Sequence, residues 1–90
     1  MGEKIRVIFY QEGDAWMAQG IDRDICVQAD ELDDLYGRLE VAVRLECEET
    51  GTLEHIPAAP DHFVRMWDGR SGQYTPKNRD SSQYEVGMAA

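Results

Sequence analysis

Alternating apolar positions near the start of the chain predict a small antiparallel sheet. Residues 5–10 (IRVIFY) alternate so that both faces are apolar, which is typical of a strand in the middle of a sheet. Gly13-Asp14 supplies turn chemistry, and residues 15–19 resume an extended pattern, so these segments should form a hairpin. A looser connection over residues 20–24 leads to a short third strand over residues 25–28. We therefore expect a three-stranded antiparallel meander.

The pattern then changes to the period of a helix over residues 31–50. Asp30 is expected to cap this helix, with Asp33 completing an acidic version of the capping box. Negative charge in the first turn also suits the positive end of the helix dipole. One apolar stripe should pack on the sheet, with Glu46 as its single misfit: Leu32, Leu35, Tyr36, Leu39, Ala42, Val43 and Cys47.

Val41 and Leu45 lie outside that stripe, one turn apart on the far side of the predicted helix. Gly37 is near them, where it costs roughly 1 kcal/mol relative to Ala but permits close approach of another backbone. We expect the C-terminal segment or another subunit to cover this second apolar site.

The last third of the chain predicts a helix, a loop and a strand. Residues 57–60 (PAAP) halt regular structure, and apolar residues at helical spacing follow up to Gly69, so a short second helix should form a lid on the core. Residues 71–83 have the composition of a mobile loop. Residues 84–88 alternate again and should add a strand, either within the chain or across a dimer.

These elements indicate an α+β fold: a three-stranded antiparallel meander and a long helix (βββα), then a short helix and a C-terminal strand. The 90 residues should form one domain, with a core over residues 1–56 and a second part over residues 57–90. No apolar run approaches the roughly 20 residues of a membrane helix. The start shows no leader, and Arg6 stands where a myristoylation signal has Ser or Thr. We expect a cytoplasmic protein.

The negative charge is concentrated on the long helix. Residues 30–54 contain nine acidic and two basic residues, whereas residues 1–29 contain five and three and residues 56–90 contain four of each. Such a surface repels nucleic acid and attracts basic proteins. The candidate contact residues for a basic protein partner or a second copy of the chain are Gly37, Val41, Leu45, Glu48 and Glu49.

The sequence patterns that could indicate a catalytic or metal-binding site are less specific than the acidic pattern of the long helix. His55 and His62 are separated by a proline-rich connection and no third ligand has a recognisable spacing. Asp14, Asp22 and Asp24 lie in predicted turns, where Asp is favoured by local hydrogen bonds as well as by acid chemistry. We expect no catalytic residue, no metal and no cofactor.

Three further features have structural explanations. Residues 69–72 (GRSG) are a weak candidate for an anion site and fit a helix terminus. Trp16, Phe63 and Trp67 could stack on bases, but such stacking works together with a basic groove and this chain is rich in acidic residues, so they are expected to be core residues. The two cysteines, Cys26 and Cys47, should be reduced packing residues close together in the core.

Residues 5–49 resemble the N-terminal domain of HicB-type antitoxins. The resemblance rests on the strand IRVIFY, the turn Gly13-Asp14, the strand AWMA, the strand ICV with its cysteine, and the helix start DELDDL. It implies a partial ribonuclease-H-like fold without the nuclease site, and a domain that binds a small basic RNA-cleaving toxin. Where the family usually has glycines this chain has Ile25 and Ala29, and residues 57–90 lack a basic recognition helix. The chain thus looks like a stand-alone relative without the DNA-binding segment.

Two alternatives to an antitoxin remain open at this stage. The chain could be a self-assembling domain without a toxin, in which Val41, Leu45 and the C-terminal strand build an oligomer. It could instead be a nuclease with ribonuclease-H-like chemistry, which needs clustered carboxylates. The resemblance would place one of those carboxylates in the middle of the first strand, and residues 5–10 contain none.

Overall fold

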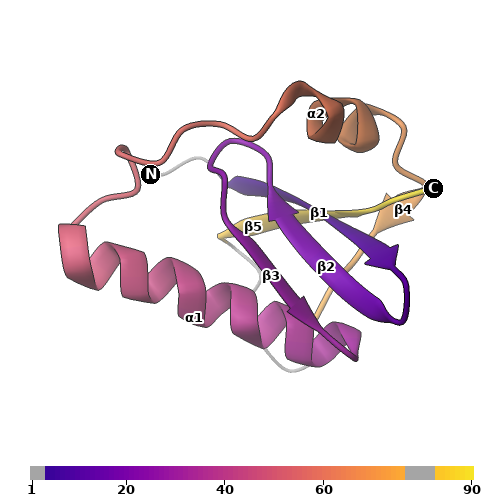
Figure 1. The fold of residues 1–90 in the computed structure, drawn as a ribbon, viewed down its shortest axis with the longest axis horizontal. Coiled ribbons are helices and arrows are strands. Elements are labelled where there is room, and N and C mark those ends of the chain that lie inside the picture. The colour runs from indigo at the N-terminus through magenta and orange to yellow at the C-terminus, as the bar shows by residue number, and fades with distance from the viewer. Residues whose placement is uncertain (1–3, 77–82) are drawn as a thin grey trace.

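The fold is a five-stranded mixed sheet with one helix on each face (Figure 1). The computed structural model describes residues 4–76 and 83–90. Its strands are β1 (Ile5–Glu12), β2 (Ala15–Gly20), β3 (Cys26–Ala29), β4 (Gly72–Gln73) and β5 (Tyr84–Met88), and its helices are α1 (Leu32–Thr50) and α2 (Asp61–Asp68). The strand order across the sheet is β3-β2-β1-β5-β4. The predicted α+β class and the meander of β1, β2 and β3 are confirmed.

β1 is the central strand, as its two apolar faces predict. It pairs antiparallel with β2 on one side and parallel with β5 on the other. Gly13 takes a φ of 62° in the β1–β2 turn, a left-handed conformation that glycine adopts at little cost. Val7, Ile8 and Phe9 are fully buried, because a strand with neighbours on both edges and helices on both faces has no side open to water.

The two faces of the sheet carry separate apolar cores. On one face, Val7 and Phe9 pack with Leu35 and Leu39 of α1. On the other face, Ile8 packs against Trp67 of α2. Figure 1 shows α1 and α2 on opposite sides of the strands, so the chain forms three layers.

The C-terminal strand forms within the chain, by parallel pairing of β5 with β1. The long helix begins one residue later than the sequence suggests: Glu31, not Asp30, is the N-cap, and no side chain caps it. Asp33 does not complete a capping box, because its carboxylate accepts a hydrogen bond from the Tyr74 hydroxyl. The predicted second helix is confirmed, with Gly69 as its C-cap.

Part of the loop predicted over residues 71–83 is ordered. β4 pairs with β5, and the ring of Tyr74 lies between the rings of Phe9 and Tyr36, at centroid distances of 5.4 and 6.2 Å. The loop interpretation was wrong for Gly72 and Gln73, because they pair with β5, whereas Tyr74 follows the strand and contacts the core beneath α1. The remainder of that prediction, residues 77–82, lies outside the described residues.

Both cysteines are free and exposed, which contradicts the prediction of a packed pair. Cys26 points to the face of β3 opposite α1, since its neighbours Ile25 and Val27 pack against the α1 core. Cys47 lies beyond Val43, the last buried residue of α1. The helix continues past the part of the sheet that could bury its final turns.

Candidate functional site

The outer side of α1 carries the two large apolar side chains that the described part of the chain leaves most exposed. Val41 is 42% and Leu45 is 50% accessible to solvent. The described C-terminal residues do not cover them, because β5 lies in the sheet between β1 and β4. One of the two predicted covers is therefore excluded for those residues, and cover by another molecule stays a prediction.

Two shallow hollows meet at Leu45 and its neighbour Ala42. The first is lined by Asp33, Asp34, Gly37, Arg38, Val41, Ala42 and Leu45. The second shares Ala42 and Leu45 and continues past β3 to the connection after the helix, where it is lined by Asp24, Ile25, Cys26, Glu46, Glu49, His55, Ile56 and Pro57. We call the two hollows together the α1–β3 groove. Its centre is apolar and its two ends are acidic.

The acidic residues at the end of α1 are placed against the helix dipole. The last turns contain Glu46, Glu48 and Glu49, and the last turn contains no basic residue. Negative charge near a helix C-terminus is unfavourable, by about 0.3–1 kcal/mol for each exposed group. Arg44 lies 4.0 Å from Glu48, a distance at which an exposed pair contributes little. The helix dipole therefore does not favour this arrangement.

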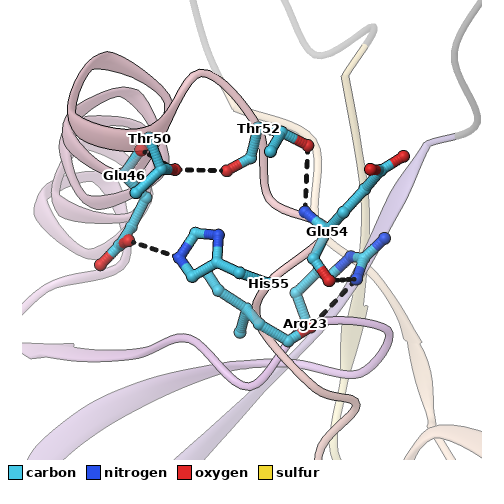
Figure 2. Close-up of polar contacts among 7 residues, drawn as sticks. Arg23, Glu46, Thr50, Thr52, Glu54 and His55 are labelled. Carbon is cyan, nitrogen blue, oxygen red and sulfur yellow. Dashed lines mark hydrogen bonds and ion pairs between the residues drawn. The ribbon is translucent and has the colours of Figure 1, made fainter.

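Gly51 ends the helix and the following connection is held in place (Figure 2). Gly51 has a φ of 79° and donates its backbone N–H to the carbonyl oxygen of Cys47. The Thr50 hydroxyl lies 2.8 Å from the carbonyl oxygen of Glu46 and 2.7 Å from that of Thr52. Figure 2 also shows His55, whose Nε2 lies 3.2 Å from a carboxylate oxygen of Glu46.

This connection is also attached to the loop between β2 and β3. Arg23 donates from Nη1 to the carbonyl oxygens of Glu54 and Ile56, at 3.3 and 3.0 Å (Figure 2). The Asp24 N–H donates to the carbonyl oxygen of Pro57 at 2.7 Å. The end of the α1–β3 groove near Glu49 and His55 is therefore built on hydrogen-bonded backbone.

The three aspartates singled out as candidate acids do not form a catalytic pair. Asp22 accepts hydrogen bonds from Arg6, with Nη2 to Oδ1 at 2.6 Å, and this guanidinium holds the pKa of Asp22 below its usual value. Asp24 accepts from Nε2 of Gln19 at 2.8 Å. Asp14 is exposed in the hairpin turn. Two of these carboxylates are thus occupied by structural hydrogen bonds.

The histidines and cysteines are likewise not assembled into a reactive site. His55 contacts Glu46, whereas His62 stacks on Phe63 at a centroid distance of 3.9 Å. Within residues 4–76 and 83–90, no three His, Cys, Asp or Glu side chains are grouped so that they could hold a metal ion. Desolvation, and then the charges of Asp24 and Glu12, raise the pKa of the Cys26 thiol. A raised pKa disfavours the nucleophilic thiolate.

Two of the three aromatic candidates, Phe63 and Trp67, belong to the α2 layer, and the glycine-rich segment follows α2. Trp67 is buried, and the guanidinium of Arg70 lies 4.2 Å from its ring centroid. Arg70 also donates from Nη1 to the carbonyl oxygen of Trp67 at 2.8 Å. Phe63 packs on this core and Trp16 on the core beneath α1. Residues 69–72 therefore follow the C-terminus of α2, as the helix-terminus interpretation of this segment predicts.

Sequence reasoning found the candidate contact residues but missed the part that β3 plays. It identified Gly37, Val41 and Leu45 from their helical positions, and these do line one hollow. Glu48 lines neither hollow, whereas Glu49 and the unpredicted Glu46 line the second. The hydrogen bond from Arg38 Nη1 to the carbonyl oxygen of Gln28, at 2.9 Å, was also missed. Nothing in the local pattern signals a contact between residues on different elements.

Comparison with protein families, with curated proteins and with solved structures gave no match for this chain. No helix in the described ranges is both long and apolar enough to cross a membrane.

Proposed function

We propose that this chain is a non-catalytic protein-binding domain that holds a basic protein against the outer side of α1. The observation that carries the proposal is the combination of exposed Val41 and Leu45 with the carboxylates at both ends of the α1–β3 groove. The apolar centre would supply contact area, and the acidic ends would attract and orient a basic partner.

The partner class that we propose is a small basic RNA-cleaving toxin, with this chain as its HicB-like antitoxin. The motive is the resemblance of residues 5–49 to HicB-type N-terminal domains. Three antiparallel strands followed by a long helix are the order of elements that this resemblance implies, and that order is observed here. The proposal includes no cofactor and no direct contact with nucleic acid, since the chain has a formal net charge of -9.

The placement of the carboxylates supports a non-catalytic role. Metal-assisted cleavage of a nucleic acid uses clustered carboxylates to hold its metal ions. The buried centre of β1 is apolar, and one of the candidate acids, Asp22, is bound to Arg6. A ribonuclease assay with magnesium or manganese should show no cleavage of RNA or of RNA–DNA hybrids.

The direct test is binding to the product of the adjacent reading frame, provided that this product is small and basic. Calorimetry at about 50 mM and about 500 mM NaCl should show affinity that falls as salt screens the charges. The triple change Glu46→Gln, Glu48→Gln and Glu49→Gln should weaken binding at low salt. A matched control is the triple change Asp61→Asn, Asp68→Asn and Glu85→Gln, which removes three acids that lie on α2 and β5. Equal effects of the two sets, or no binding, would contradict the proposal.

The second candidate function is self-assembly without a toxin. Exposed Val41 and Leu45 favour it, because an oligomer would cover them. The acidic side of α1 opposes it, since two copies would bring like charges together. Light scattering on the wild type and on the double variant Val41→Glu/Leu45→Glu separates the two ideas: a wild-type monomer removes self-assembly, and an oligomer that the variant dissociates supports it.

A further inference from the structure

β3 is an edge strand whose outer side has no strand beside it in the described sheet. The Gly20 N–H donates to the carbonyl oxygen of Ile25 at 2.8 Å, in the register that also pairs Ala18 with Val27. Backbone groups alternate in direction along an antiparallel strand. Val27 and Ala29 therefore direct their backbone groups toward β2, as Ile25 directs its carbonyl, and Cys26 and Gln28 direct theirs away from the sheet.

α1 runs beside this open edge and forms one wall of the groove. Arg38, Ala42, Leu45 and Glu49 succeed one another along the side of α1 nearest β3, and all of them line the hollows. A strand added to β3 would place every second side chain on the α1 side, as Val27 does, over Ala42 and Leu45. The remaining side chains would lie on the opposite face with Cys26 and Gln28.

Arg38 covers one acceptor of this edge. Its Nη1 donates to the carbonyl oxygen of Gln28 at 2.9 Å, and both residues are exposed. Native proteins often protect edge strands with charged side chains. An exposed arginine can change its rotamer at little cost. Arg38 would therefore hinder non-specific pairing of β3 with other chains without preventing a specific partner from binding.

We propose that the partner docks by adding an extended basic segment to the open edge of β3, with its apolar side chains against Ala42, Val41 and Leu45. The inference rests on the proposed function and specifies how the basic partner is held. Backbone hydrogen bonds to Cys26 and Gln28 supply affinity, and the groove selects the side chains.

The charges that line the groove favour a basic segment over a second copy of this chain as the strand added to β3. The carboxylates that line the α1–β3 groove are Asp24, Asp33, Asp34, Glu46 and Glu49. Among the described residues, Arg38 is the only arginine that lines it, and it is engaged with Gln28. A segment with Arg or Lys at its ends, beside the two acidic ends of the groove, complements these carboxylates, whereas a second copy of β3 and α1 would bring the same carboxylates with it.

The test uses the full chain and a defined probe, the peptide acetyl-Arg-Val-Arg-Val-Arg-Val-Arg-amide. Two isomers of this peptide each carry three N-methyl groups. In one isomer they are on the three valines, and in the other they are on three of the four arginines, so the two isomers have the same charge and the same side chains. Each isomer loses the N–H donors of one edge only. Strand addition predicts that one isomer binds like the parent peptide and the other at least roughly tenfold more weakly; the isomer that fails reports the strand direction.

Amide hydrogen exchange supplies an independent readout. The parent peptide should slow exchange at the N–H groups of Cys26 and Gln28, which point off the sheet. Equal binding of both methylated isomers, or no slowing at these two amides, would overturn strand addition. Salt-sensitive binding of the basic partner would survive that result, so the failure of this inference is distinguishable from failure of the proposed function. Slowing that rises with protein concentration without peptide would identify a second copy as the occupant and would overturn the proposal.

Arg38 provides a matched pair of variants. Arg38→Ala removes one positive charge and uncovers the Gln28 carbonyl, whereas Arg44→Ala removes one positive charge on the same helix beside Glu48. Peptide affinity should therefore rise more in Arg38→Ala than in Arg44→Ala. An equal rise in both variants would mean that net charge alone matters and would count against pairing at this edge.

Discussion

Trp67 of α2 lies directly over Gly87 of β5. A Cβ atom at position 87 would fall 3.0 Å from Cζ3 of the Trp67 ring and 2.5 Å from Cδ of Arg70. Gly87 thus lets α2 approach the sheet closely enough for Trp67 to reach the core that it shares with Ile8 and Ile21. Position 87 requires glycine because any side chain would collide with Trp67 and Arg70, and not because its backbone needs the conformational freedom of glycine.

Gly87→Ala should therefore destabilise the protein, because the Arg70 side chain and the Trp67 ring must both move to make room. We expect a loss of about 1–3 kcal/mol in the free energy of unfolding, measured by denaturant titration. Gly72→Ala is the matched control, since a Cβ there meets nothing within 4 Å. Equal stability of the two variants would show that α2 does not pack on β5 in this way.

The two sides of α1 should respond differently to the same substitution. Leu39 is 1% exposed in the core, whereas Leu45 is 50% exposed in the groove. Leu39→Ala should cost about 2–5 kcal/mol of unfolding free energy, and Leu45→Ala should change it by less than about 0.5 kcal/mol. A large loss in Leu45→Ala would show that this side chain is part of the fold and not a contact surface.

The Arg6–Asp22 ion pair predicts a specific dependence of stability on pH. Since hydrogen bonds from Arg6 lower the pKa of folded Asp22, the pair stabilises the fold above the unfolded pKa of Asp. That contribution is lost as the pH falls from about 4 through the lower folded pKa. Both side chains are about two-fifths exposed (40% and 41%), so we expect an effect of about 1 kcal/mol or less.

Asp22→Asn should reduce stability at neutral pH and flatten this part of the acid profile. Asp14→Asn, in the exposed hairpin turn, serves as the control because Asn suits the same turn. Thermal melts between about pH 2 and about pH 7 would compare them. If the Asp22→Asn and wild-type profiles run parallel, the ion pair does not contribute in solution.

Local pattern was sufficient for much of the fold. The alternation around Gly13 predicts the hairpin. The apolar stripe of α1 predicts its four buried residues, Leu35, Tyr36, Leu39 and Val43, although Leu32 and Ala42 of the same stripe are only half-buried. The parallel pairing of β5 with β1 was beyond such reasoning, because alternation in residues 84–88 shows a strand but not its neighbour. Tyr74 escaped for the same reason: a polar, glycine-rich segment gives no local sign that one aromatic ring will be fixed by a distant core.

Only part of the candidate site could be predicted from the sequence. Val41 and Leu45 could be found because a helix has a fixed period, and an apolar residue outside the stripe is noticeable. The open edge of β3 could not, since it depends on the order of strands across the sheet. The acids were found as a charge total, but their placement in the groove required the path of the connection after Gly51.

The most direct test of the account is to map the contact surface on the protein itself. Backbone amide NMR shifts would be recorded while the basic product of the adjacent reading frame is added at low salt. The account predicts that shifts concentrate on the outer side of α1 around Val41 and Leu45 and on β3, and that they diminish at high salt. Shifts centred on α2 and β4, or the same shifts at both salt concentrations, would contradict it.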